Sequence, residues 1–474
     1  MLDLILESWV CGLMEVAKVR HRGKPLTWNE GEKLKLLFLG YNGGRNTGAD
    51  VRVHEMLRQV EKILGKDQCE LTVVTQSYKL TKGYFGDSKQ IRLPQLYPPW
   101  LGSEIPKYHG LIACEGSMFK SKFADALTTL MVGGLGMAAA RNKLSVGYGA
   151  EAGKMNFMPR WMTSRYCRDS FVIARNEESQ DLLNSMGVPA KMGTDTAWTF
   201  EPASPERAEE ILRENGWDGE TPVLAVCPIN PFWWPVSANF TKAILRAKLG
   251  WYKESHFRSY YFHKTGPEVD RAYEYYLNSI AEGVNRFRKE HKVFPILVAM
   301  EMVDAVSCEK LQGKLDENAP ILSSRHINMF DLVAVLRRCS MMISSRYHAI
   351  VTSMPGLVPS AGITMDERIR NLMHQRDQKE LVVEVDQNDL PEHVYHLLNV
   401  LHNEHERIRD GIGRTVVEQL HEMAKMGALF DAHLHERLPE FPARCRGADW
   451  LGYLPELHPA LQELVEKYQT VEAS

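Results

Sequence analysis

Long apolar runs, paired cysteines and an excess of charge are all missing from this sequence of 474 residues. No stretch reaches the roughly 18 uninterrupted apolar residues that a membrane-spanning helix needs. The eight cysteines include no CxxC pair and no Cys/His spacing typical of zinc sites, so we expect no metal site and a reducing compartment. A net charge of −3 gives no general attraction to nucleic acid.

The N-terminus also lacks the pattern of a signal peptide. Asp3 and Glu7 stand where a signal peptide carries positive charge, so we expect a soluble, cytoplasmic protein. Residues 2–17 instead predict an amphipathic helix, and a basic cluster follows at residues 20–24. We favour a helix that docks on the body of the protein or on a second subunit of a homo-oligomer. The alternative is a peripheral contact of residues 1–24 with a membrane.

The chain is long for a single hydrophobic core, which predicts more than one domain. Apolar strand-like segments alternate with helical segments, as is typical of α/β folds. A stretch rich in proline and glycine, residues 201–221, predicts the connection between two such domains. The predicted division is 1–30 for the N-terminal helix and basic linker, 31–205 and 222–386 for two Rossmann-like domains, and 387–474 for a helical C-terminal extension.

One strand-to-helix turn, SSRYHAIVTSM at residues 344–354, carries the clearest functional pattern. A short apolar strand precedes it and an apolar helical segment follows. Arg346 and His348 therefore stand at the carboxyl edge of a predicted parallel strand, where open α/β sheets bind their ligands. The helix N-terminus adds a positive field that favours phosphate or carboxylate. The alternative is a capped helix with an exposed arginine.

A glycine-rich loop, GYNGGRNTGAD at residues 40–50, connects the first core strand to the first core helix. Glycines let a backbone approach a ligand closely, and the helix N-terminus can hold an anion. The spacing is neither that of Walker A nor that of GxGxxG. Asn42, Gly43, Gly44 and Arg45 are the candidate ligand-binding residues of this loop.

Charged residues follow several other predicted strands, and these are Glu115, Arg175, Asp195, Glu301 and Asp304. Because the carboxyl ends of parallel strands meet at one edge of a sheet, we expect Arg175, Arg346 and His348 to converge on one cleft between the domains. For Arg175 the alternative is an ion pair with the acidic residues that follow it. For Asp195 a structural role is equally open.

The turn at 344–354 and the segment after it, PSAGITMDER at 359–368, resemble the C-terminal signature of the polysaccharide pyruvyl transferase family. That signature is S-x-R-x-H-A, then a short strand and a Tyr-Asp-x-Lys-like segment. Here Met365 stands at the tyrosine position and Arg368 at the lysine position.

The resemblance extends over most of residues 34–375. The loop at 40–50 is similar to the family's Gly-Gly-x-Asn-x-Gly-Asp, with Asp50 one place later than the acidic residue. Glu115 stands where relatives usually have a glycine-rich turn. The resemblance implies an α/β, GT-B-like fold, in which two Rossmann-like domains face a cleft, here with helical N- and C-terminal extensions.

The resemblance also implies an activity, the transfer of a pyruvyl group from phosphoenolpyruvate onto two sugar hydroxyls as a ketal. The acceptor would be a cell-surface or lipid-linked glycan, as in exopolysaccharide and cell-envelope biosynthesis. This chemistry requires no metal and no other cofactor, and we expect none.

The donor-binding and acid–base residues follow from the same resemblance. Arg175 and Arg346, with Tyr347 and the four loop residues, would bind the donor, because a guanidinium group pairs well with carboxylate and phosphate. His348, expected to titrate near neutrality, would act as catalytic acid or assist phosphate departure.

The acceptor side is assigned to carboxylates. Glu115 or Asp304 would accept the proton of the sugar hydroxyl, and a second histidine is an alternative. Asp195 and Glu301 would hold sugar hydroxyls.

Other functions stay open at this point. The same fold could bind a nucleotide sugar, as in a GT-B glycosyltransferase or a nucleotide-sugar epimerase, or the chain could be a non-catalytic glycan-binding relative. The aromatic and basic segment 232–265, which includes Tyr252 and Tyr260, could stack on sugars or pack on itself.

Overall fold

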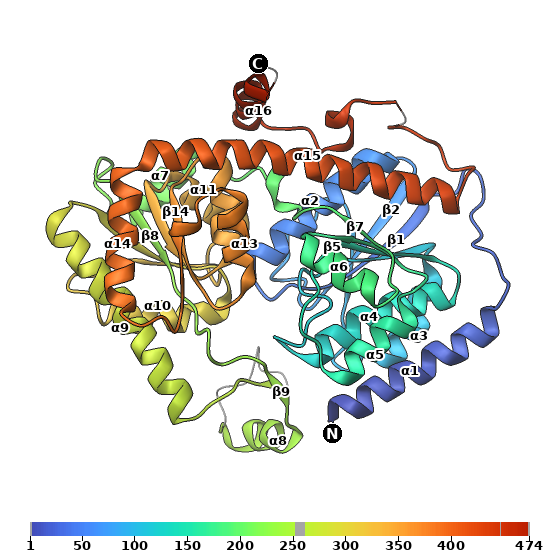
Figure 1. Cartoon of the computed structure of the whole chain (residues 1–474). Coiled ribbons are helices and arrows are strands. Elements are labelled where there is room, and N and C mark those ends of the chain that lie inside the picture. The colour runs from blue at the N-terminus through green and yellow to red at the C-terminus, as the bar shows by residue number, and fades with distance from the viewer. Residues whose placement is uncertain (1, 252–260, 446, 473–474) are drawn as a thin grey trace.

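The computed structural model, which describes residues 2–251, 261–445 and 447–472, contains two parallel sheets in adjacent lobes (Figure 1). The N-terminal lobe is built on β1 to β7, and the C-terminal lobe on β8 and β11 to β15. Helices cover the faces of each sheet, as parallel sheets require. The α/β, GT-B-like architecture predicted from the sequence is confirmed.

The N-terminal sheet has the strand order β3-β2-β1-β4-β5-β6-β7. Successive residues of β1 face opposite sides, so Phe38 packs in the core beneath α2 whereas Leu37 and Leu39 pack toward α4. The elements are β1 (Leu34–Asn42), α2 (Thr47–Leu64), β2 (Cys69–Thr75), β3 (Lys89–Arg92), α3 (Pro98–Glu104), β4 (Gly110–Ala113), α4 (Asp125–Ala140), β5 (Leu144–Ala150), α5 (Phe157–Tyr166), β6 (Phe171–Ala174), α6 (Glu177–Ser185) and β7 (Ala190–Met192).

The C-terminal sheet repeats this arrangement with the order β12-β11-β8-β13-β14-β15. In each sheet the strand order reverses beside the first strand, between β1 and β4 and between β8 and β13, which leaves a crevice at the carboxyl edge. The elements are β8 (Val223–Cys227), α9 (Pro267–Glu290), β11 (Phe294–Ala299), α10 (Ala305–Gln312), β12 (Ile321–Ser323), α11 (Met329–Arg338), β13 (Met341–Ser344), α12 (Tyr347–Ser353), β14 (Ser360–Thr364), α13 (Glu367–Gln375) and β15 (Val382–Glu384).

The helical C-terminal segment joins the lobes. It comprises α14 (Leu390–Asn403), α15 (His405–Arg437), the 3₁₀ turn η7 (Trp450–Tyr453) and α16 (Pro459–Glu472). α15 runs along both lobes (Figure 1), and Gln59 of α2 donates a hydrogen bond to its Met423 carbonyl at 2.7 Å. The chain therefore returns to the N-terminal lobe, while α16 packs against α15, where the Tyr468 ring lies over Gly413.

The stretch expected to connect the domains, residues 201–221, contains a helix, α7 (Pro205–Glu214). Ser204 caps it and Pro205 occupies its first turn, where a proline costs no hydrogen bond. α7 packs on α11, and Arg338 of α11 binds Glu209 at 2.9 Å. The proline that suggested a linker is thus a helix start.

The aromatic segment forms a small excursion from the C-terminal lobe, with β9 (Ser237–Ala238), α8 (Phe240–Leu249) and β10 (Tyr261–Phe262). The ring of Trp233 stacks on His263 with 4.1 Å between centroids, so this segment packs partly on itself. Tyr252 and Tyr260 lie outside the described residues.

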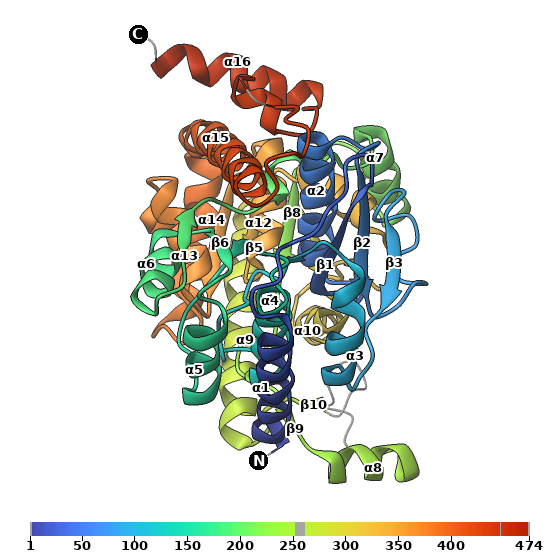
Figure 2. The same cartoon turned by 90° about the vertical axis from the view of Figure 1, so that its right-hand side faces the viewer.

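The N-terminal helix α1 (Leu2–His21) docks on the body and lies along α4 (Figure 2). Its buried Val10 and Met14 sit over Gly133 and Gly136 of α4. A Cβ atom at Gly136 would lie 2.5 Å from the Met14 sulfur, so the glycine permits this close helix packing. Within the described residues, every helix falls short of the length and apolar composition needed to cross a bilayer.

We predict that Gly136→Val lowers the free energy of unfolding by about 1–3 kcal/mol, because the new side chain overlaps Met14 and Tyr166. Gly102→Val in α3 is the matched control, since no atom lies within 4 Å of its Cβ position. Urea unfolding of both variants measures the difference. Equal losses in the two variants would contradict the packing described for α1.

Candidate functional site

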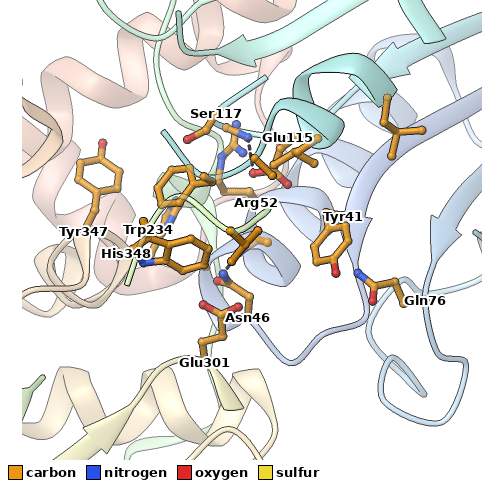
Figure 3. Close-up of a pocket in the computed structure, with 18 of the residues that line it drawn as sticks. Tyr41, Asn46, Arg52, Gln76, Glu115, Ser117, Trp234, Glu301, Tyr347 and His348 are labelled. Atoms are coloured by element: carbon orange, nitrogen blue, oxygen red, sulfur yellow. Dashed lines mark hydrogen bonds between the residues drawn. The ribbon is translucent and has the colours of Figure 1, made fainter. Parts of the chain in front are cut away.

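A cavity of about 290 Å³ lies between the lobes, at the carboxyl edges of both sheets. Its walls come from the segments after β1, β4 and β6 of the N-terminal lobe and after β8, β11, β13 and β14 of the C-terminal lobe. The crevices of both sheets therefore open on the same space. Figure 3 shows polar side chains of both lobes turned into it.

Arg346 enters the cavity from the end of β13. Its Nε donates to Asp304 Oδ2 at 2.7 Å and its Nη2 donates to Glu301 Oε2 at 2.7 Å, while Nη1 has no partner among the described residues. Burial opposes the charge of Arg346, but Asp304 and Glu301 raise its pKa, so the guanidinium stays charged. Two carboxylates thus fix this cation at the cavity wall.

His348 stands in the first turn of α12, with its Nε2 3.3 Å from Asp195 Oδ2. The N-terminus of α2 meets the other side of the ring, since a Cβ atom at Gly48 would come within 2.3 Å of it. Burial lowers the pKa of His348 to about 4, although Asp195 acts in the opposite direction. The imidazole is therefore neutral at neutral pH.

Asp195, after β7, is buried and holds three groups together. Besides His348, its Oδ2 lies 3.0 Å from Arg52 Nε and 3.2 Å from Arg175 Nη1. Burial disfavours the charge, but Arg52 and His348 hold the pKa of this carboxyl well below its usual range. With an ionised acceptor beside it, Nε2 of the histidine carries the proton and Nδ1 is left as the acceptor.

A row of alternating charges extends from Asp195 across the boundary between the lobes. Arg175 also pairs with Glu151, and Lys120 binds Glu151 at 2.6 Å. Lys120 pairs in addition with Glu367, at the start of α13 in the C-terminal lobe. We call these five residues the charge row. Because every charge in it has an opposite neighbour, the row can be buried.

The segment after β4 forms the opposite wall of the cavity, where Glu115 and Ser117 line it (Figure 3). Glu115 accepts a hydrogen bond from the Gly116 N–H at 3.0 Å. A Cβ atom at Gly116 would lie 3.0 Å from Arg52 Nη1 and 3.1 Å from Arg175 Nη1. The glycine therefore lets the backbone lie directly on the two guanidinium groups.

The structure brings together many of the residues that the sequence singled out. Those that line the cavity are Glu115, Arg175, Glu301, Arg346, Tyr347 and His348, joined by Arg368 of the family signature. Arg175 pairs with Glu151 and Asp195 rather than with the acidic residues that follow it in sequence.

The four candidate residues of the glycine-rich loop are placed differently, because the side chains of Asn42 and Arg45 bond to residues outside the cavity. Asn42 donates to a carbonyl of β2 at 3.2 Å, and Arg45 donates to the Tyr84 hydroxyl at 2.5 Å. Asn42, Gly43, Gly44 and Arg45 do not line the cavity; the later loop residues Asn46 and Gly48 do.

Asp304 and Asp195 also lie behind the cavity wall rather than in it. Asp304 is fully buried under the Arg346 guanidinium, and Asp195 is covered by its three partners. Neither carboxylate is exposed to a ligand in the cavity, so each acts on the arginine or histidine in front of it.

Arg52, Glu151 and Lys120 belong to this site although the sequence did not single them out. One signal for Arg52 was available, because it lies one helical turn before Met56, on the inward face of α2. A charged residue on an apolar face needs a buried partner, and here the partner is Asp195.

The family model for polysaccharide pyruvyl transferase matches residues 46–367 of the chain. A protein from Listeria monocytogenes assigned as a UDP-N-acetylglucosamine 2-epimerase has a similar structure, with a TM-score of 0.51, 12% identity, and coverage of 86% of this chain and 98% of that one. The UDP-GlcNAc 2-epimerase of Methanocaldococcus jannaschii has a TM-score of 0.50, 11% identity, and coverage of 78% and 93%. At these identities the likeness shows the fold alone. Among proteins with curated descriptions, none matches.

We predict that His348 makes stability depend on pH between 6.5 and about 4. Because its pKa is lowered in the folded state, the unfolded chain takes up the proton first as the pH falls, and up to about 3 kcal/mol of stability is lost across this window. His348→Gln should flatten that part of a curve of unfolding free energy against pH. His405→Gln, which removes an exposed imidazole, is the control, and identical curves for wild type and His348→Gln would refute the prediction.

Proposed function

Since the chain belongs to the polysaccharide pyruvyl transferase family, we propose that it moves the pyruvyl group of phosphoenolpyruvate onto two hydroxyls of a sugar, in a cell-surface or lipid-linked glycan. The product is a ketal, and phosphate is released. The observation that carries the proposal is the pairing of a fixed guanidinium, Arg346, with a neutral imidazole, His348, in one cavity between the lobes.

The donor is a small anion with a carboxylate and a phosphate, and the cavity offers matching groups. Arg346 is held by two carboxylates, its Nη1 has no partner among the described residues, and Arg368 and Arg175 line the same cavity. The N-termini of α2 and α12 both face the cavity through Gly48 and Tyr347, and their N–H groups favour an anion. We assign the donor to the part of the cavity that is lined by Arg346, Arg368 and Arg175.

The reaction adds one proton to C3 of phosphoenolpyruvate and removes one proton from each of two sugar hydroxyls. A proton added to the C3 methylene of phosphoenolpyruvate leaves a cationic C2, which one sugar hydroxyl attacks. The C2–O bond to phosphate then breaks and a second hydroxyl closes the ketal. Two C–O bonds form and one breaks. One of the two hydroxyl protons replaces the proton that was added to C3. The other leaves with the phosphate. Oxidants and reductants take no part.

We assign the proton transfers to His348 and Glu115. Glu115 gives C3 its proton and regains one from the second hydroxyl, whereas His348 serves the first hydroxyl and the phosphate. Of the carboxyl and imidazole groups that line the cavity, Glu301 is bound to Arg346. Glu115 accepts a backbone N–H and has no other hydrogen-bond partner within the described part of the chain. His348 is neutral with Nδ1 as acceptor, which suits it to take the proton of an attacking hydroxyl. Negative charge bound beside the ring raises its pKa, so the same imidazolium can then protonate the leaving phosphate.

Asp304 and Asp195 become positioning residues in this proposal. Asp304 fixes Arg346 with two hydrogen bonds, and Asp195 fixes the tautomer of His348. We assign the acceptor sugar to the side of Trp234, which lines the cavity from the C-terminal lobe. Aromatic faces of this kind stack on the apolar face of a sugar ring.

The first test of the proposal is donor identity. We expect phosphoenolpyruvate to bind in isothermal titration calorimetry, and to release phosphate when a glycan acceptor is present. UDP-GlcNAc is the comparator, because the epimerases named above share the fold. Tight binding of UDP-GlcNAc with no binding of phosphoenolpyruvate would reject the pyruvyl transferase assignment.

A second test separates donor binding from turnover. Arg346→Lys keeps the charge but loses the planar group, so donor affinity should fall by about 10- to 100-fold, as expected for the loss of 1–3 kcal/mol from a charged hydrogen bond. His348→Gln should leave the donor affinity nearly unchanged and lower kcat by about 100-fold or more. Arg325→Lys, an exposed arginine outside the cavity, is the control. If His348→Gln abolished binding yet kept kcat, the roles assigned here would be wrong.

A further inference from the structure

The exposed apolar side chains of this protein gather on three helices. Among the described residues, 15 large apolar side chains are exposed, and ten of them lie on α1, on α5, or on α8 with the residue that follows its capping glycine. Clusters of this kind mark interaction surfaces, because soluble proteins usually scatter such side chains. We call the exposed sides of α1, α5 and α8 the apolar face.

α1 has two apolar sides. Val10, Met14 and Ala17 are buried against the body, whereas Ile5, Trp9, Val16 and Val19 form an outward stripe with the spacing of one helix face. Ile5 is 58% exposed and Val19 is 77% exposed. Docking on α4 accounts for the inner side only, so the outer stripe needs another explanation.

The acidic residues of α1 do not share this outer side. Glu7 is buried, Asp3 accepts a hydrogen bond from Tyr261, and Glu15 pairs with Arg165 of α5. The exposed charged residues of α1 are Lys18 and Arg20, both basic. The outer side of the helix is therefore apolar with a positive end.

α5 and α8 repeat this combination. Neither helix contains an aspartate or glutamate. On α5, Phe157 is 83% exposed and Trp161 lies beside the exposed Arg160. On α8, Ile244 and Leu249 are exposed with Lys248. The exposed charges on the three helices are thus basic, apart from Glu15, whose side chain is 41% exposed and pairs with Arg165.

The apolar face adjoins the cavity. α8 lies between β9 and β10, and the same excursion supplies Trp234, Val236 and Tyr261 to the cavity wall. Tyr261 also bonds to Asp3 of α1. Both cartoon views place α8 at the same end of the molecule as the N-terminus of α1 (Figures 1 and 2).

We propose that the apolar face of α1, α5 and α8 binds the surface of an anionic lipid bilayer. Its apolar side chains enter the boundary between headgroups and acyl chains, and its basic side chains contact the headgroups. A second copy of the chain fits this face less well, because a two-fold contact would bring exposed basic residues against one another. This inference does not depend on the proposed reaction.

The test is co-sedimentation of the full chain with vesicles, without substrate. Vesicles of phosphatidylcholine mixed with phosphatidylglycerol should bind the protein, vesicles of phosphatidylcholine alone should bind it much less, and added salt should weaken binding. Ile5→Ser with Trp9→Ser, and separately Phe157→Ser, should each lower the partition coefficient by about tenfold or more, because lipid no longer buries those side chains.

Val306→Ser with Leu451→Ser is the matched control, because it removes two exposed apolar side chains outside the apolar face and should leave vesicle binding unchanged. Thermal unfolding of each variant establishes that it is folded. Absence of binding to anionic vesicles, or equal binding by wild type and both apolar-face variants, would overturn the proposal. So would a dimer in sedimentation velocity that Ile5→Ser with Trp9→Ser dissociates, since a second copy would then occupy the face.

Discussion

The organisation of the site depends on one buried carboxylate, that of Asp195. A lone ionised carboxylate in a protein interior costs several kcal/mol, and here Arg52, Arg175 and His348 surround it. Two of these partners belong to the N-terminal lobe and the third to α12 of the C-terminal lobe. Asp195 is therefore fully surrounded by its partners only when the two lobes are together. The contact between Asp195 and His348 also sets the tautomer of the histidine.

The parallel sheets explain why so many charged residues reach this place. Each parallel strand ends at the same edge, so one side chain after each of β4, β6, β11 and β13 can be brought into a single cavity without a long loop. The cost is crowding of charge, and the charge row resolves it by alternating sign from Asp195 to Glu367. The same ion pairs therefore hold the charged side chains in place beside the cavity and allow them to be buried.

The sequence was enough to predict which charged residues follow the strands, but not which residues they contact. Arg346 and His348 were recognisable because an apolar strand and an apolar helix flank them within a dozen residues. The contact between His348 and Asp195 spans 153 positions, and local patterning carries no information at that distance. The glycine-rich loop was predicted at the right element, yet Arg45 turns to Tyr84 because that hydroxyl lies within its reach. The helix α7 was missed because a proline at a helix start resembles a proline in a linker.

The long helix α15 has a mechanical consequence. Its 33 residues extend for about 50 Å and make contacts with both lobes, through α2 on one side and the 3₁₀ turn Met354–Gly356, which follows α12, on the other. A helix resists stretching because its backbone hydrogen bonds lie along the axis, so α15 acts as a strut that keeps the lobes at a fixed separation along its length. Widening of the cavity would therefore proceed by rotation about this helix rather than by extension along it. Such a motion would separate Asp195 from His348, whose contact joins the two lobes, so the two side chains would meet only when the lobes are closed.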